Sequence, residues 1–161
     1  MAPAQASLLA KLDTQERVRD FLTNAVASGR ASHAYLFLGA PGAGKLDAAW
    51  ALAQAFLCEQ DGCGACDSCV RVARHTHPDV HYYAPESATG YLIAQTRELL
   101  DDVPLAPIRA KAKVYIIDRA EQLRANTANA LLKTLEEPPE GVMFILLGTS
   151  ADVMLPTIVS R

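Results

Sequence analysis

Short apolar runs alternate along the chain with stretches in which apolar residues recur every three or four positions. The runs at residues 34–38, 114–117 and 142–147 have the length of strands buried in a parallel sheet, and a weaker strand is indicated at residues 80–82. The spaced stretches predict helices over residues 18–26, 49–56, 92–103 and 128–135. Asp13 and Glu16 resemble a capping box before the first helix, and Gly29 is expected to end it.

Strands that alternate with helices predict an α/β fold, in which right-handed crossovers build a parallel sheet with helices on both faces. The chain has 161 residues, half of them apolar and a fifth charged, which is typical of one soluble globular domain. No apolar run reaches the roughly 18–20 residues of a membrane helix. Residues 1–11 lack the pattern of a secretory signal, so we expect a cytoplasmic protein without a membrane span.

All four cysteines of the chain lie within twelve residues: Cys58, Cys63, Cys66 and Cys69. This spacing is typical of metal ligands, whereas a disulfide framework would spread along the chain. Four thiolates complete the tetrahedral shell of a structural zinc ion, and Gly62 and Gly64 allow the backbone to wrap around it. Two local disulfides or a redox pair of cysteines are the alternatives. A further alternative replaces one thiolate with a histidine, from the set His75, His77 and His81.

Residues 39–46 read Gly-Ala-Pro-Gly-Ala-Gly-Lys-Leu, between a predicted strand and a predicted helix. This is the G-x-x-x-x-G-K pattern of a phosphate-binding loop. Its glycines, Gly39, Gly42 and Gly44, let backbone N–H groups converge on phosphate oxygens, and Lys45 adds a positive charge. A plain glycine-rich turn with a surface lysine is the alternative. Leu46 stands where a working loop has the Ser or Thr that ligates Mg²⁺, so we expect the metal to be poorly held.

The strand predicted at residues 114–117 ends in Asp118, the usual acidic partner of a phosphate loop, which lies near the metal. Active ATPases of this type carry a glutamate at the next position to orient the attacking water. This chain has Arg119 there, which stays protonated and cannot act as a base. Glu121 is close in sequence, but helical geometry is expected to point it elsewhere. Leu46 and Arg119 together suggest a fold that has lost hydrolysis.

With these motifs in place, the chain resembles the delta-prime subunits of the bacterial DNA polymerase III clamp loader, within the AAA+ family of P-loop NTPases. The landmarks are residues 32–37, the four cysteines, residues 77–80, 113–118, 129–139 and 160–161. The block at residues 129–139 is very specific to clamp-loader subunits. The gamma/tau motor subunits share this block but keep the loop hydroxyl and an Asp-Glu pair. Leu46 and Arg119 therefore favour the delta-prime subunits.

The resemblance implies that residues 1–161 are the AAA+ domain, with a small zinc module inserted at 58–69. The helical lid and the collar that builds a five-subunit spiral would lie outside this chain. Ser160 and Arg161 match the first two positions of the family's Ser-Arg-Cys motif, whose arginine is a finger reaching a neighbouring ATP site. Thr149 resembles the sensor residue that faces the γ-phosphate, although a threonine that caps a strand end is an equal interpretation.

The implied partners are the gamma/tau and delta subunits, the sliding clamp through the complex, and weakly bound primer–template DNA. The basic signal for DNA is thin, and a solvated surface is the favoured interpretation of its members, Arg71, Arg74, Arg109, Lys111 and Lys113. The implied activity belongs to the DNA polymerase III holoenzyme rather than to this subunit alone. A true ATPase of the gamma/tau type and a small metabolite kinase remain rival functions, and binding of ATP with Mg²⁺ without hydrolysis stays open.

Overall fold

The computed structural model describes residues 8, 12, 16–40, 42, 44–137 and 139–149. Its elements follow one another as α1 (Glu16–Ala27), β1 (Ala34–Leu38), α2 (Lys45–Leu57), α3 (Asp67–Ala73), β2 (Val80–Tyr83), α4 (Ile93–Asp102), β3 (Lys113–Ile117), the 3₁₀ turn η3 (Ala120–Gln122), α5 (Ala125–Glu136) and β4 (Val142–Gly148). The predicted strands and helices are therefore present, with boundaries within a few residues of those expected.

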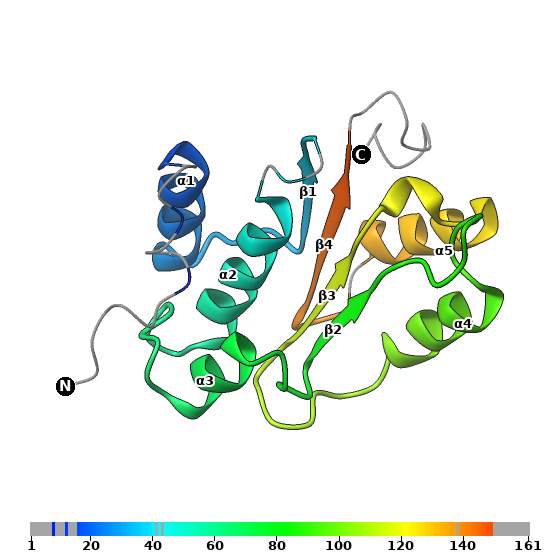
Figure 1. Ribbon diagram of the computed structural model, residues 1–161. Helices are drawn as coiled ribbons and strands as arrows, with labels where there is room; N and C mark the ends of the chain where they lie inside the picture. The colour runs from blue at the N-terminus through cyan, green and yellow to red at the C-terminus, as the bar shows by residue number, and fades with distance from the viewer. Residues whose placement is uncertain are drawn as a thin grey trace.

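The four strands form one parallel sheet in the order β1-β4-β3-β2. Ala34 lies opposite Phe144, Lys113 opposite Val142, and Val80 opposite Val114. Helices α1, α2 and α3 lie on one side of the sheet, and α4 and α5 on the other (Figure 1). The α/β fold class with a flanked parallel sheet is confirmed.

Alternate side chains of the central strands enter two separate cores, because successive strand residues point to opposite faces. The core under α1, α2 and α3 contains Val114, Ile116, Met143, Ile145 and Leu147. The core under α4 and α5 contains Tyr115, Ile117, Phe144 and Leu146. Burial on both faces is the reason that β3 and β4 read as continuous apolar runs in the sequence.

Five buried positions of α2 are alanine and belong to the core on this side of the sheet: Ala48, Ala49, Ala51, Ala53 and Ala55. This helix begins at the phosphate loop and ends at the first cysteine, so it joins the two candidate sites of the chain. Among the described residues, no helix is long and apolar enough to cross a membrane.

The sequence did not predict α3, a seven-residue helix inside and after the cysteine segment. The helix is too short to show a clear apolar period, and its buried residues are Cys69 and Val72. Val72 joins the core beside α2, so the cysteine segment is packed against the domain on this side.

Candidate functional site

The carboxyl ends of three neighbouring strands bring the predicted phosphate-site residues together. Gly39 follows β1, Thr149 follows β4 and Asp118 follows β3, and these strands are adjacent in the sheet. A cavity of about 490 Å³ lies at this edge, lined by Gly42, Gly44, Lys45, Leu46, Asp47, Asp118, Arg119, Glu121, Gln122, Leu147 and Thr149. Arg161, the predicted finger, lies outside the described residues.

Lys45 is the first residue of α2 and bridges two strand ends. Its Nζ donates to the carbonyl oxygen of Gly39 at 2.6 Å and to that of Gly148 at 3.0 Å. The Gly39 amide also donates to the Gly148 carbonyl at 3.1 Å. The ammonium group is therefore held at the junction of β1 and β4, beside the cavity that would take phosphate.

The loop has the backbone of a phosphate cradle at the two glycines before Lys45. Gly42 has φ +83° and Gly44 has φ +91°, values that side chains with a Cβ rarely adopt. Leu46 follows in α2, lines the cavity and packs partly against the core. Its side chain is a hydrocarbon, at the position where the hydroxyl of a Ser or Thr would bind a metal ion.

Asp118 is fixed in place by four hydrogen bonds. Its carboxylate accepts from the Tyr82 hydroxyl at 2.7 Å and from the Arg119 amide at 2.9 Å. Its carbonyl accepts from the Tyr91 hydroxyl, and its amide donates to the backbone carbonyl of Tyr83. Burial, and then the Asp118 carboxylate, raises the pKa of Tyr82 to about 12, so the phenol remains a donor.

Arg119 has a left-handed backbone, with φ 47°, and its side chain is exposed at the rim of the cavity. This conformation turns the chain directly into η3. At the position where an ATPase has the catalytic carboxylate, this chain thus has an arginine, a cation that accepts no proton.

The expectation that Glu121 points elsewhere is wrong, because Glu121 lines the same cavity as Asp118. Between the two carboxylates the backbone is left-handed at Arg119 and then enters the 3₁₀ turn η3, so the α-helical spacing that the prediction assumed does not apply. Gln122 donates to the Arg119 carbonyl and Leu123 to the Ala120 carbonyl, the hydrogen bonds of such a turn. An α-helical continuation was the wrong local geometry to assume.

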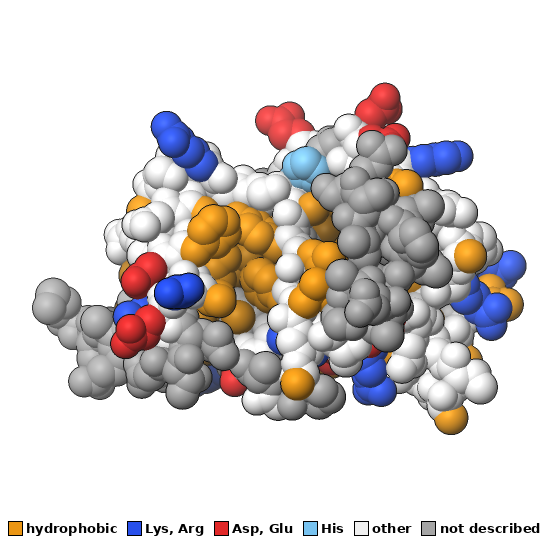
Figure 2. All heavy atoms as spheres, turned by 90° about the horizontal axis from the view of Figure 1, so that it is seen from above, with side chains coloured by type: hydrophobic (Ala, Val, Ile, Leu, Met, Phe, Trp, Pro, Cys, Tyr) orange, Lys and Arg blue, Asp and Glu red, His pale blue; other side chains and the backbone are white. Residues whose placement is uncertain are grey.

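A second hollow adjoins the phosphate loop on the side of α1. Seen from the carboxyl ends of the strands, apolar side chains gather there (Figure 2). The hollow has about 320 Å³ and is lined by Val18, Leu36, Phe37, Leu38, Gly44, Lys45 and Ala48. Gly44 and Lys45 line both hollows and therefore lie between them.

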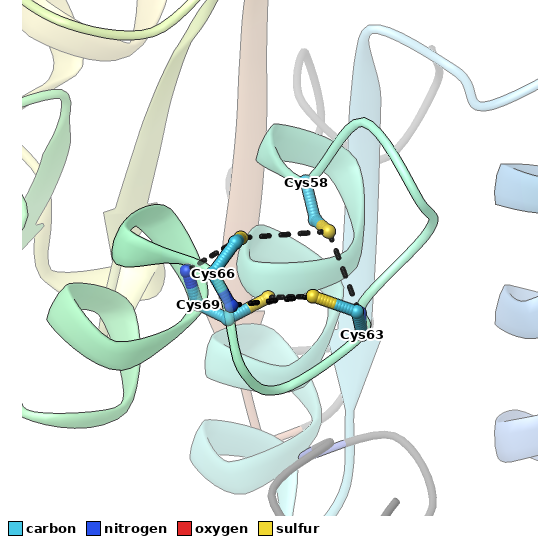
Figure 3. Close-up of side chains that lie close together, drawn as sticks. All are labelled: Cys58, Cys63, Cys66 and Cys69. Carbon is cyan, nitrogen blue, oxygen red and sulfur yellow. Dashed lines mark hydrogen bonds between the residues drawn. The ribbon is translucent and has the colours of Figure 1, made fainter. Parts of the chain in front are cut away.

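The four cysteine sulfurs face one another between α2 and α3 (Figure 3). All four lie within 4.8 Å of one another; the Cys63 and Cys69 sulfurs are 4.0 Å apart, and the Cys66 and Cys58 sulfurs 3.8 Å. A tetrahedral zinc ion with bonds of about 2.3 Å requires sulfurs about 3.8 Å apart. The four thiols are free, so neither local disulfide is present, and the cluster is compatible with a structural zinc site.

Backbone N–H groups point at the sulfurs and favour thiolates. Donation from the amides of Ala65 and Cys66 lowers the pKa of Cys63 to about 6. Burial raises the pKa of Cys66 and of Cys69, so a cation is needed to hold these two as thiolates. The predicted wrapping by glycine is present, with φ +98° at Gly62 and +79° at Gly64.

None of the three histidines joins the sulfur cluster. His75 stacks on Trp50 with ring centroids 3.9 Å apart, and His81 faces Asp102 at 3.3 Å. His77 is buried; its Nε2 lies 3.2 Å from the Ser68 hydroxyl, and its Nδ1 accepts from the amide of Asp79. The sulfurs alone form the candidate metal shell.

Asp79 clamps the loop beside the cysteine cluster. Its carboxylate is fully buried and accepts from the amides of Ile108, Arg109 and Ala110 at 2.6–2.7 Å. Burial by itself would raise the pKa of Asp79, but these three donors outweigh it and hold the pKa below its usual range. Residues 77–80, singled out only by resemblance, therefore join α3 to the 105–112 segment.

The five basic residues are not all solvated. Lys113 lies in β3, is only 2% exposed and donates to the carbonyl and the carboxylate of Asp102, so the interpretation that it lies on a solvated surface is wrong. Arg71 and Arg109 both pair with the carboxylate of Asp67. Three of the five cations are thus engaged within the domain.

Comparison with known proteins gives a consistent family. The model described as "DNA polymerase III, delta subunit" matches residues 14–161. The Bacillus subtilis DNA polymerase III subunit delta' is 40% identical over 152 residues, 92% of this chain and 46% of that protein. The Escherichia coli subunit tau is 42% identical over 151 residues, 91% of this chain and 23% of that protein.

Among solved structures, a DNA polymerase III gamma subunit-related protein from Thermotoga maritima has the same fold. The TM-score is 0.61 at 22% identity, over 88% of this chain and 43% of that chain. The chain spans less than half the length of these relatives. It belongs to the DNA polymerase III delta-subunit family of clamp-loader subunits, and its described residues have the AAA+ fold of these proteins.

Proposed function

We propose that the protein works as a delta-prime-type subunit of the DNA polymerase III clamp loader and does not hydrolyse ATP by itself. The observation that carries this proposal is the pair of residues at the phosphate cavity, Leu46 and Arg119. A leucine cannot ligate Mg²⁺, and an arginine cannot orient water as a base. Both changes impair the same reaction, while Gly44 and Lys45 preserve the loop.

The relatives support an assembly role, because they are DNA polymerase III subunits. The helical lid and collar that the resemblance implies would lie outside this chain, which spans 46% of the delta' relative. Residues 1–161 would form the AAA+ domain, with residues 58–69 as its metal module. The partners would be the gamma/tau and delta subunits and, through them, the sliding clamp and primer–template DNA.

The four cysteines, Cys58, Cys63, Cys66 and Cys69, would hold one structural zinc ion. Support comes from the sulfur separations, the free thiols and the amides aimed at the sulfurs. A closed shell of four thiolates leaves no position for substrate, so the zinc would stabilise the fold and take no part in catalysis.

The isolated full-length protein is expected to release no phosphate from ATP above background, because the cavity lacks both the loop hydroxyl and the base. The measurement is steady-state phosphate release, with Lys45→Ala as the matched variant that removes the loop cation. The second candidate function, a gamma/tau-type motor, has support in the 42% identity with the E. coli tau subunit. Motor-like turnover that Lys45→Ala abolishes would establish that alternative and reject ours.

Arg161 would complete the ATP site of a neighbouring subunit. An arginine supplied in trans stabilises charge on the transferring phosphoryl group. It raises the rate of hydrolysis at the ATP site that it reaches about 10³-fold or more. Arg161→Ala in the full-length protein is therefore expected to leave assembly of the complex intact and to lower its clamp-dependent ATPase about tenfold or more. Arg97→Ala, an exposed arginine on α4, is the control. Unchanged turnover in the reconstituted Arg161→Ala complex would exclude the finger.

A further inference from the structure

The cysteine cluster contains two close sulfur pairs, and each pair has one partly exposed and one buried member. The sulfurs of Cys63 and Cys69 lie 4.0 Å apart, and those of Cys66 and Cys58 lie 3.8 Å apart (Figure 3). Cys63 and Cys66 are partly exposed, whereas Cys58 and Cys69 are buried, with 3% and 0% of their surface exposed. A reagent that comes from solvent therefore meets one residue of each pair before the other.

A pocket opens beside the cluster, between the cysteine segment and residues 109–111. It has about 340 Å³ and is lined by Cys58, Cys63 and Cys66, together with the cations Arg109 and Lys111. Cys69 is not among its lining residues. The volume is far larger than the roughly 30 Å³ that a water molecule occupies in the liquid, so a small polar reagent can enter.

The pocket combines exposure with positive charge. Arg109 pairs with the carboxylate of Asp67, whereas Lys111 is exposed and forms no ion pair with any described residue. Cysteines in electropositive, partly exposed surroundings are the reactive ones, and cysteines buried in the structure are inert. Cys63 and Cys66 meet both conditions for reactivity, so the geometry separates the two pairs into attacking and following sulfurs.

We propose that the cysteine cluster is a site of oxidation by hydroperoxides, in which Cys63 and Cys66 react first and their partners Cys69 and Cys58 complete two disulfides. The inference rests on the proposed zinc site and adds a reaction to it, because oxidation of the four thiolates releases the ion. The cluster then serves as a structural metal site that responds to peroxide.

Each sulfur pair consumes one hydroperoxide. With hydrogen peroxide, the exposed thiolate attacks one oxygen and the O–O bond breaks; a sulfenic acid forms, and the hydroxide that leaves takes a proton from solvent to become water. The buried thiolate then attacks the sulfenic sulfur, so an S–S bond forms, the S–O bond breaks, and a second hydroxide takes a proton. Two thiolates lose two electrons and the peroxide gains them. After both pairs have reacted, no thiolate remains to hold zinc.

The test treats full-length, zinc-loaded protein with hydrogen peroxide. Free zinc is followed with a chromogenic chelator, and the disulfides are mapped by mass spectrometry after cleavage before Asp61 and Asp67, which separates Cys58 and Cys69 from the other two cysteines. Release of about one zinc ion per chain is expected, together with the two disulfides named above. A thiol reductant with added zinc should restore the loaded protein, because disulfides are reversible products.

The order of reaction is measured with dimedone, which traps sulfenic acids. Label on Cys63 and Cys66 should exceed label on Cys58 and Cys69 at least about tenfold, since exposure and charge control thiol reactivity. Equal labelling of all four cysteines, disulfides between other partners, or oxidation that the reductant does not reverse would overturn the inference.

The pocket is tested as the route with Lys111→Met, which removes its unpaired cation. Zinc release by peroxide should be slower by about threefold or more, because nearby positive charge favours reaction of the thiolate. Lys133→Met, an exposed lysine on α5, is the matched control and should behave as wild type. An unchanged rate in Lys111→Met, or zinc that stays bound in peroxide, would overturn this inference alone. Protein that carries no zinc before treatment would contradict the proposed zinc site as well.

Discussion

Cys69→Ser is expected to reduce bound zinc from about one ion per chain to near zero and to cause a large loss of stability. Cys69 is fully buried, and its carbonyl accepts from the Gln54 side chain of α2, so the ligand and the helix packing are coupled. Loss of a structural zinc removes folding free energy directly, and we expect about 3 kcal/mol or more. In a chain of this size that corresponds to a fall in melting temperature of about 6–12 °C.

The measurement is elemental analysis combined with thermal unfolding of protein prepared in metal-free buffer. Asp61→Asn is the matched control: Asp61 lies in the same loop with φ 58°, which asparagine tolerates, and it carries no sulfur. A chelator should lower the melting temperature of wild type as the substitution does, and added zinc should restore only wild type. Zinc content near zero in wild-type protein would reject the metal site.

Asp79→Ala is expected to destabilise the domain by an amount comparable to the loss in Cys69→Ser. It would leave three backbone N–H groups of the 108–110 segment without their acceptor, in a place where the carboxylate is fully buried. At about 1–3 kcal/mol for each unsatisfied buried donor, partly relieved by water, we expect a loss of about 3–5 kcal/mol. Asp79→Asn keeps one acceptor oxygen and should lose less.

The effect should also be local, because Asp79 clamps the loop that carries two trypsin sites, Arg109 and Lys111. Tryptic cleavage at these residues should be faster in Asp79→Ala than in wild type, while Asp101→Ala, an exposed aspartate of α4, should match wild type. If Asp79→Ala had the same melting temperature and the same cleavage rate as wild type, the Asp79 hydrogen bonds would contribute nothing to the stability of this loop.

The contribution of the Asp79 carboxylate to stability is expected to depend on pH. The pKa of Asp79 is lower in the folded protein than the ordinary value of 3.8, so the folded state binds the proton less readily than the unfolded state. Its contribution is therefore complete well above pH 4 and is lost as the pH falls through the folded pKa. The difference in melting temperature between wild type and Asp79→Ala should be constant near neutrality and shrink below about pH 4.

The sequence was sufficient for features that depend on local composition. Apolar runs as long as β3 and β4 are typical of burial on both faces, and the glycine spacing before Lys45 is that of a phosphate loop, so both could be predicted. The cysteine spacing likewise predicted a cluster, because residues so close in the chain need only a tight turn to meet.

Other features depended on which distant groups share a space. From the sequence, Lys113 was interpreted as a solvated charge in a loop. In the structure it is a buried residue of β3 that donates to Asp102. Asp79 carries no chemical signal in the sequence, since its three donors lie about thirty residues away. Helix α3 is stabilised by a cysteine sulfur that accepts from the Cys69 amide at its first turn, which residue propensity does not show.

By itself, the sequence determined the α/β layering, the phosphate loop, the cysteine cluster and the family, because each follows from residue types at short spacing. Only the tertiary structure decided that Glu121 lines the phosphate cavity. The chain between β3 and α5 has a left-handed residue, Arg119, followed by a 3₁₀ turn, and its Ala120 and Leu123 pack into the core with distant strands and helices, which short-range sequence patterns do not show.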